Sequence, residues 1–147
     1  MLRLMTSEDY SALYALWLCC AGMGLNSVDD TEESITRFLL RNPDTCFVYE
    51  EEGTILGAIL AGNDGRRSYI YHAAVHPDHR RQGIGRQLLE ASEQALKDLG
   101  LSKCGLFVYD TNPSGNAFWE KQGYTVRTDI VYRNKILAEN LVTIKVK

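Results

Sequence analysis

The chain has 147 residues, a length that fits one compact domain with a hydrophobic core. Its formal net charge is −3, so general nucleic-acid binding is not expected. No apolar run approaches the roughly 18 to 20 residues that span a bilayer, and the four cysteines form no C-x-x-C pair. We expect a single domain over residues 1–147 that is soluble and cytoplasmic, with unpaired thiols and without a nucleic-acid or membrane partner.

The first part of the chain predicts a short strand and two helices ahead of the main sheet. The strand covers about residues 2–5, and the first helix runs to about residue 21 with apolar residues at helical spacing. Asp30 or Thr31 is suited to cap the second helix, which Pro43 stops.

The rest of the chain alternates between strands and helices. A hairpin is predicted at 46–61, because two strand-like runs flank Glu51-Glu52-Gly53. The further expected elements are a strand at 68–75, a helix from the glycines near 84 to Leu99, a strand at 103–109, a helix at 114–122 and strands at 124–132 and 141–146. The fold class is therefore mixed α/β, with about six to seven strands and about four helices.

A turn rich in arginine and glycine lies between the strand at 68–75 and the following helix. Gly83 and Gly85 let a ligand approach the backbone, and the helix start offers unpaired N–H groups and the positive end of its dipole. Forked donors and positive charge come from Arg80, Arg81 and Arg86. The Lys-Ser/Thr pair of a Walker A loop and the third glycine of a dinucleotide fingerprint are both missing. The turn is expected to hold the phosphates of another ligand.

Two segments resemble those of a known family. Arg80-x-x-Gly83-x-Gly85, preceded by Ala74-Val75 and followed by an apolar-periodic helix, resembles the acyl-CoA signature of the GCN5-related N-acetyltransferase (GNAT) superfamily. Residues 112–124, NPSGNAFWEKQGY, are similar to the family's N-x-x-A-x-x-L-Y-E-K-x-G-F. The resemblance runs from about Leu2 to about Tyr132 and implies a central mixed, twisted sheet and acetyl-CoA as the acyl donor. By this resemblance and the turn, the residues at the coenzyme are Val75, Arg80, Arg81, Gln82, Gly83, Ile84, Gly85, Arg86, Asn112 and Trp119.

The resemblance also locates the chemistry on the strand at 68–75. In the family this strand splays from the next one, so that backbone groups near the equivalent of Val75 bind the pantetheine arm and donate to the thioester oxygen. Strict alternation places Tyr69, Tyr71 and Val75 on one face, and Ile70, His72 and Ala74 on the other. The ordinary pKa of a tyrosine, about 10, is too high for a base at neutral pH, so Tyr71 is expected to order water or contact substrate. His72 titrates in the useful range, but a lone histidine on an interior strand is also typical of a structural residue.

The turn before this strand contains candidates for acceptor binding. Asp64, Arg66 and Arg67 form either a solvated hairpin tip or a loop that approaches the acceptor, where an arginine pairs with a substrate carboxylate; Tyr69 is grouped with them. A metal site is not expected. His72, His76 and His79 have helical spacing, but Pro77 and the strand pattern argue against a helix there.

One residue departs from the family pattern. Trp119 occupies the position where the family has the tyrosine that protonates the leaving thiolate, and an indole N–H is no proton source at neutral pH. Either the thiolate leaves without a protein acid, or Tyr109 or water supplies the proton. Asn112 is read as a pantetheine contact, as a helix cap before Pro113, or as both.

The sequence therefore predicts an acetyl-CoA-dependent N-acetyltransferase that acts on a primary amine of a small molecule or peptide. A homodimer is one possible oligomeric state. The alternative is a weak or inactive acyl-CoA-binding regulatory domain, which Trp119 and the missing acidic base would explain.

Overall fold

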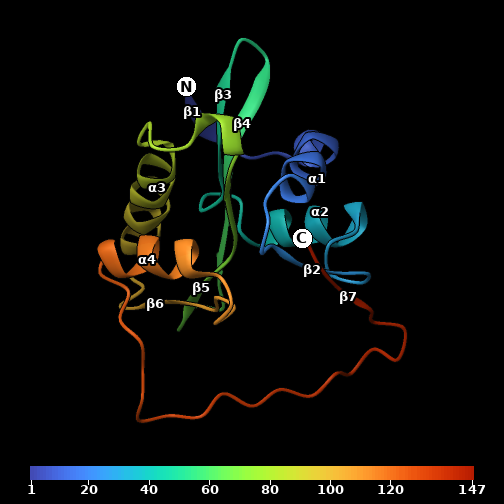
Figure 1. Ribbon diagram of the computed structural model, residues 1–147, viewed down its shortest axis with the longest axis vertical. Helices are drawn as coiled ribbons and strands as arrows, with labels where there is room; N and C mark the ends of the chain where they lie inside the picture. The colour runs from blue at the N-terminus through green and yellow to red at the C-terminus, as the bar shows by residue number, and fades with distance from the viewer.

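The computed structural model describes residues 1–147 as three layers, in which a central sheet separates two pairs of helices (Figure 1). The helices α1 (Tyr10–Leu18) and α2 (Glu32–Arg41) cover one face, and α3 (Ile84–Asp98) and α4 (Pro113–Lys121) cover the other. Short 3-10 turns, Ser7–Asp9 and Pro77–His79, precede α1 and follow the fifth strand. The mixed α/β class and the four helices agree with the prediction. None of these helices combines the length and the apolar character that crossing a bilayer requires.

The central sheet has five strands in the order β1-β3-β4-β5-β6. Their bounds are β1 Leu2–Leu4, β3 Phe47–Glu51, β4 Thr54–Asn63, β5 Ser68–Val75 and β6 Cys104–Leu106. The first four are antiparallel to their neighbours, and β6 runs parallel to β5. The predicted hairpin is the β3–β4 pair. The sheet is therefore mixed, as expected.

Two further strands form a separate ribbon. β2 (Gly24–Asn26) pairs antiparallel with β7 (Thr143–Lys145), so the seven strands divide into a five-stranded and a two-stranded sheet. The expected strand at 124–132 does not form, and the one at 103–109 shortens to 104–106. The physical reason is the lack of a partner: β7 pairs with β2 instead of extending the sheet beyond β6, and an unpaired strand leaves its backbone groups unsatisfied. The chain after α4 instead swings away from the body before it returns to β2 (Figure 1).

Each face of the sheet has its own apolar core. Leu13, Trp17 and Ile35 lie in the cluster between the sheet and α1 and α2. Leu88 and Leu89 of α3 lie in the second cluster, on the opposite face. Burial of each such side chain contributes about 1.5–3 kcal/mol, so β4 and β5 are fixed from both sides. They form a rigid support for the site.

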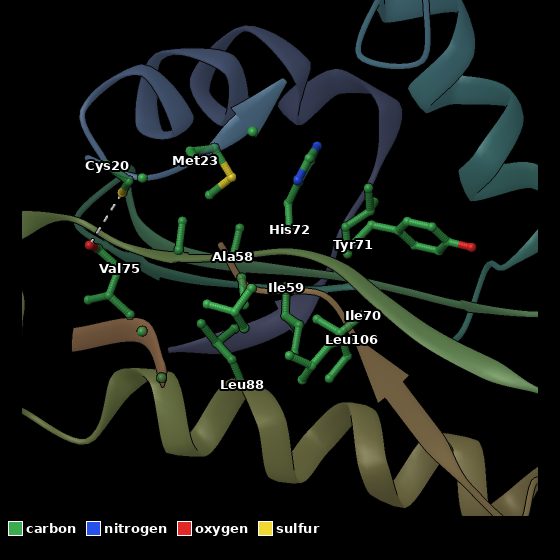
Figure 2. A pocket seen from close by; sticks show the side chains of 18 of the residues that line it. Cys20, Met23, Ala58, Ile59, Ile70, Tyr71, His72, Val75, Leu88 and Leu106 are labelled. Atoms are coloured by element: carbon green, nitrogen blue, oxygen red, sulfur yellow. Dashed lines mark hydrogen bonds between the residues drawn. The ribbon is translucent and has the colours of Figure 1, made fainter. Parts of the chain in front are cut away.

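A β-bulge changes the direction of side chains in the middle of β5. Leu60 pairs with His72 and Ala61 pairs with Ile70, so Tyr71 is the extra residue. Ile70 packs in the cluster on the α3 side, whereas His72 contacts Trp17 of α1 (Figure 2). The expectation that Ile70 and His72 share a face is therefore wrong, because strict alternation assumes an unbroken ladder. The bulge places Tyr71 and His72 together on the side of α1 and α2.

Candidate active site

The site opens where β5 and β6 part. Their pairing ends at Ile70 and Leu106, while β5 continues to Val75. The backbone N–H of His76 donates to Leu56 on β4 at 2.8 Å, so alternation directs the backbone groups of Val75 and Ala73 to the opposite edge, which β6 has left. The Val75 carbonyl there accepts from Cys20 Sγ at 3.6 Å (Figure 2). It also accepts from Arg80 Nε at 3.3 Å. Backbone N–H groups at this edge are placed to donate to a bound carbonyl.

A cavity of about 1990 Å³ surrounds this opening. It is lined by the loop after α1, by α2, by β5, by the turn before α3 and by α4. Small-molecule pockets usually measure about 300–1,000 Å³, so this space is larger than a single small ligand needs.

The turn at 80–86 forms one end of the cavity. Gly83 is the residue before α3 and has φ +79°, and Arg81 also has a positive φ of 62°. A left-handed backbone costs a non-glycine residue about 1–3 kcal/mol, and such strain is concentrated at functional sites. Turns of this kind present successive N–H groups to an anion, and the start of α3 adds its own. Every predicted residue of 80–86 lines the cavity except Gln82.

Not all of the arginines in the turn are free. Arg86 Nε donates to Glu90 at 2.8 Å one helical turn later, and Arg80 is held against Val75. Arg81 forms no ion pair or side-chain hydrogen bond and lines the cavity. The turn therefore offers backbone donors, one unpaired guanidinium and two partly engaged ones, which fits a pyrophosphate.

His72 lies on the other side of the opening and is paired with a carboxylate. Its Nε2 is 2.6 Å from Asp30 Oδ1, and the two residues are 9% and 5% exposed. Asp30 also accepts from the backbone N–H of Asn26 at 2.8 Å, which fixes its orientation. Figure 2 shows the second ring nitrogen, Nδ1, on the side that faces Met23. A carboxylate on one nitrogen favours a proton there and leaves a lone pair on the other.

Aromatic rings line the cavity next to His72. Tyr71 lies 5.5 Å from Phe38 of α2 and 6.4 Å from Tyr69, centroid to centroid. Partial burial raises the pKa of Tyr71, so the phenol stays neutral. The expectation that Tyr71 contacts substrate or orders water stays a prediction.

The turn at 63–67 borders a second, smaller cavity. Asp64 Oδ1 accepts from the backbone N–H groups of Arg66 and Arg67 at 2.8 and 2.7 Å. Asp64, Arg67 and Tyr69 line this cavity of about 300 Å³, whereas Arg66 lines neither of the two. The structure thus separates two arginines that the sequence treats alike.

The residues of the second motif have different surroundings. Trp119 packs edge-to-face against Phe118 at 5.0 Å and Tyr124 at 5.3 Å and borders the cavity. Tyr109 also borders the cavity, with the Lys145 ammonium 4.5 Å from its ring centre. Asn112 accepts from the backbone N–H of Gly115 at 3.0 Å, so it caps α4, and it does not line the cavity.

The histidines do not converge. His72 is hydrogen-bonded to Asp30, whereas the rings of His76 and His79 pack against each other with their centroids 5.7 Å apart. No group of three or more His, Cys, Asp or Glu side chains is arranged to hold a metal ion.

Sequence reasoning missed the partner of His72. Asp30 and Thr31 were equivalent cap candidates, and the structure uses Thr31, whose side chain accepts from Ser34 N–H at 3.2 Å. A helix start needs only one capping side chain, and here two candidates are adjacent in the sequence. That redundancy was the available signal that Asp30 has a role other than capping. Cys20 and Arg41, which also line the cavity, carried no comparable signal.

A splayed strand pair, a turn rich in glycine and arginine at a helix start, and an Asp–His pair lie along one cleft, an arrangement suited to acyl transfer. Residues 10–124 match the model of the acetyltransferase (GNAT) family, so the chain belongs to this family, and it is an acyltransferase.

Relatives and solved structures agree. An acetyltransferase of Sodalis glossinidius is 32% identical over 95% of this chain and 96% of its own length. One of Pectobacterium atrosepticum is 33% identical with the same coverage. The structure of Naa20 from Chaetomium thermophilum with a bisubstrate analogue has a TM-score of 0.74 at 25% identity, covering 86% of this chain and 71% of that one. The PaiA N-acetyltransferase of Thermoplasma acidophilum with coenzyme A has a TM-score of 0.74 at 18% identity, covering 99% and 98%, and shows the shared fold.

Proposed function

We propose that this acyltransferase transfers an acetyl group from acetyl-CoA to a primary amine of a small molecule or peptide, by direct attack on the thioester. The observation that carries the proposal is the Asp30–His72 pair beside the open edge of β5, in the cavity that the turn at 80–86 closes. The cavity supplies a donor site, an acceptor site and a proton acceptor together.

The turn at 80–86 is proposed to bind the pyrophosphate of the donor. Its left-handed residues and the start of α3 present backbone N–H groups, and Arg81 adds an unpaired guanidinium. The pantetheine arm would then follow the free edge of β5 toward Val75. A backbone N–H on this edge stabilises the negative charge that develops on the thioester oxygen.

His72 is proposed to remove the proton from the attacking amine, directly or through a water molecule. Asp30 holds the imidazole so that Nδ1 has the lone pair, and it stabilises the positive charge that the ring acquires. The amine nitrogen forms a bond to the carbonyl carbon, the C–S bond breaks, and the coenzyme leaves as thiolate. No residue is assigned as the acid, because Trp119 is packed between two rings and has no acidic proton.

The test is the release of free thiol from acetyl-CoA in the presence of a panel of primary amines, together with calorimetry of CoA binding. We expect CoA binding and thiol release that depends on the amine. CoA binding without release for any amine would contradict the proposal and favour a binding domain. Absence of CoA binding would contradict the assignment of the turn. The cytoplasmic location and a homodimer remain predictions.

A further inference from the structure

The smaller cavity continues the main one toward the start of β5. The two share Phe38, Arg41 and Tyr71, so they meet beside the aromatic rings. The Phe38 ring packs directly on the backbone of Gly62, because a Cβ atom at Gly62 would lie 2.5 Å from Cζ of Phe38. A volume of about 300 Å³ is enough for one small polar group and its stem.

The polar groups of this smaller cavity favour an anion. Arg41 and Arg67 form no ion pair in the structure. Asp64 is the one carboxylate of the lining, and the N–H groups of Arg67 and Arg66 donate to it and hold its pKa below the ordinary value. Two guanidinium groups and one ionised carboxylate leave an excess of one positive charge.

The amide side chains of this lining are already engaged. Asn42 Oδ1 accepts from the backbone N–H of Asn63 at 2.9 Å, and its Nδ2 donates to the Phe38 carbonyl at 3.3 Å. The donors left for a ligand are those of the two arginines, which carry the positive charge, and the hydroxyls of Tyr69 and Tyr71, which form no hydrogen bond in the structure. Planar guanidinium groups bind carboxylates through two parallel hydrogen bonds.

The position along β5 sets the distance from the amine. Tyr71 is adjacent to His72, and Tyr69 lies three residues before it. At about 3.3 Å per residue, the smaller cavity begins about 3 Å from His72 along the strand and extends to about 10 Å. In a free α-amino acid the amine and the carboxylate share one carbon atom. Such a ligand is too short to place its amine at His72 and its carboxylate well inside the smaller cavity. An extended peptide spans this interval with one to three residues.

From this juxtaposition we propose that the acceptor is the amino terminus of a peptide with an acidic side chain at its second or third position, and that Arg41 and Arg67 bind that side chain. The inference rests on the proposed function, because it takes the amine to lie at His72. It assigns Arg41 and Arg67 to acceptor recognition and excludes Arg66.

The experiment uses tetrapeptide amides in matched pairs: Ala-Asp-Ala-Ala against Ala-Asn-Ala-Ala, and Ala-Ala-Asp-Ala against Ala-Ala-Asn-Ala. Amidation removes the terminal carboxylate, so each pair differs in one charge. With the wild type we expect KM to be about tenfold lower for the better Asp peptide than for its Asn partner, the effect of one partly exposed charge-assisted pair. Arg41→Gln and Arg67→Gln should each reduce this ratio to about threefold or less, with KM for acetyl-CoA unchanged.

Arg66→Gln is the matched control, because it removes the same charge one residue away from the smaller cavity and should leave the ratio intact. Equal KM values for both members of both pairs, or an equal loss in the Arg66 variant, would overturn the inference. Calorimetry of the same peptides, with and without CoA, keeps it separate from the proposed function: a preference for Asp in binding supports the site even without turnover. Binding without preference counts against it.

Discussion

The two ends of the cleft, for which we propose the coenzyme and the acceptor as ligands, are built in different ways. The coenzyme end is a single continuous turn, 80–86, in which backbone conformation and a helix start supply the donors. The acceptor end takes Asp30 from a loop, Arg41 from α2 and His72 from β5, and it works through side chains. The coenzyme end should therefore tolerate many side-chain changes but not a change in backbone shape or charge sign. The acceptor end should respond to the replacement of single functional groups.

The strongest test of this contrast is His72→Gln. Loss of a general base lowers the rate by about 10²- to 10⁴-fold, and we expect kcat/KM for the amine to fall by that amount while the Kd for CoA is unchanged. Steady-state kinetics and calorimetry measure the two quantities. His76→Gln is the control, since His76 follows β5 but does not line the cavity, and should retain full activity. The loss should shrink for a weakly basic amine, which is already neutral. A change in CoA affinity in the His72 variant would break the contrast.

Gly83→Glu tests the coenzyme end. A carboxylate beside the pyrophosphate brings like charges together, and a left-handed φ disfavours a side chain at this position. We expect the affinity for CoA to fall by about 100-fold, which corresponds to about 2.7 kcal/mol. Gly100→Glu is matched in every respect but place: Gly100 has φ +87°, nothing lies within 4 Å of its Cβ position, and it sits at the other end of α3. Calorimetry of both folded variants is the measurement. A similar loss in both would assign the effect to strain.

Asp30→Asn should lower kcat about tenfold, less than loss of His72, because Asp30 acts by positioning the ring. The amide can present an N–H to Nε2 and so favour the wrong tautomer. The decisive readout is a double-mutant cycle: in the His72→Gln background the Asp30 change should have little further effect on kcat. Additive losses would show that Asp30 has a separate role, and thermal unfolding identifies any part due to stability.

Trp119→Tyr is expected to have the smallest effect on turnover, with kcat within about threefold of the wild type and stability lower by about 1 kcal/mol. The reason is that Trp119 packs against Phe118 and Tyr124, and aromatic pairs contribute about 0.5–1.5 kcal/mol. Steady-state kinetics measures kcat, and denaturant unfolding measures the free energy of unfolding. A rise in kcat of tenfold or more would mean instead that the phenol reaches the sulfur and supplies a missing acid.

The same contrast explains what the sequence revealed. The turn at 80–86 is contiguous, so its glycines, arginines and helix start were visible together, and the β3–β4 hairpin was equally local. Asp30 and His72 are 42 residues apart, and no local pattern pairs them. The bulge at Tyr71 was also hidden, because it depends on how β4 and β5 align.

The C-terminal part shows a further limit. Residues 124–132 have the composition of a strand, but they are not one, because strand formation requires a neighbour and β7 pairs with β2. Their pattern indicates the ability to pair and cannot identify the partner.

The bulge in β5 has a consequence for how this site can change. Deleting Tyr71 would restore strict alternation and leave His72 opposite Leu60, still on the side of α1, but it would remove from the cleft the ring that contacts Phe38. The extra residue is therefore what lets two successive side chains of one strand, a phenol and an imidazole, face the same cleft. Among relatives, a one-residue difference in the length of this strand would separate proteins that carry both rings in the cleft from those that carry the imidazole alone.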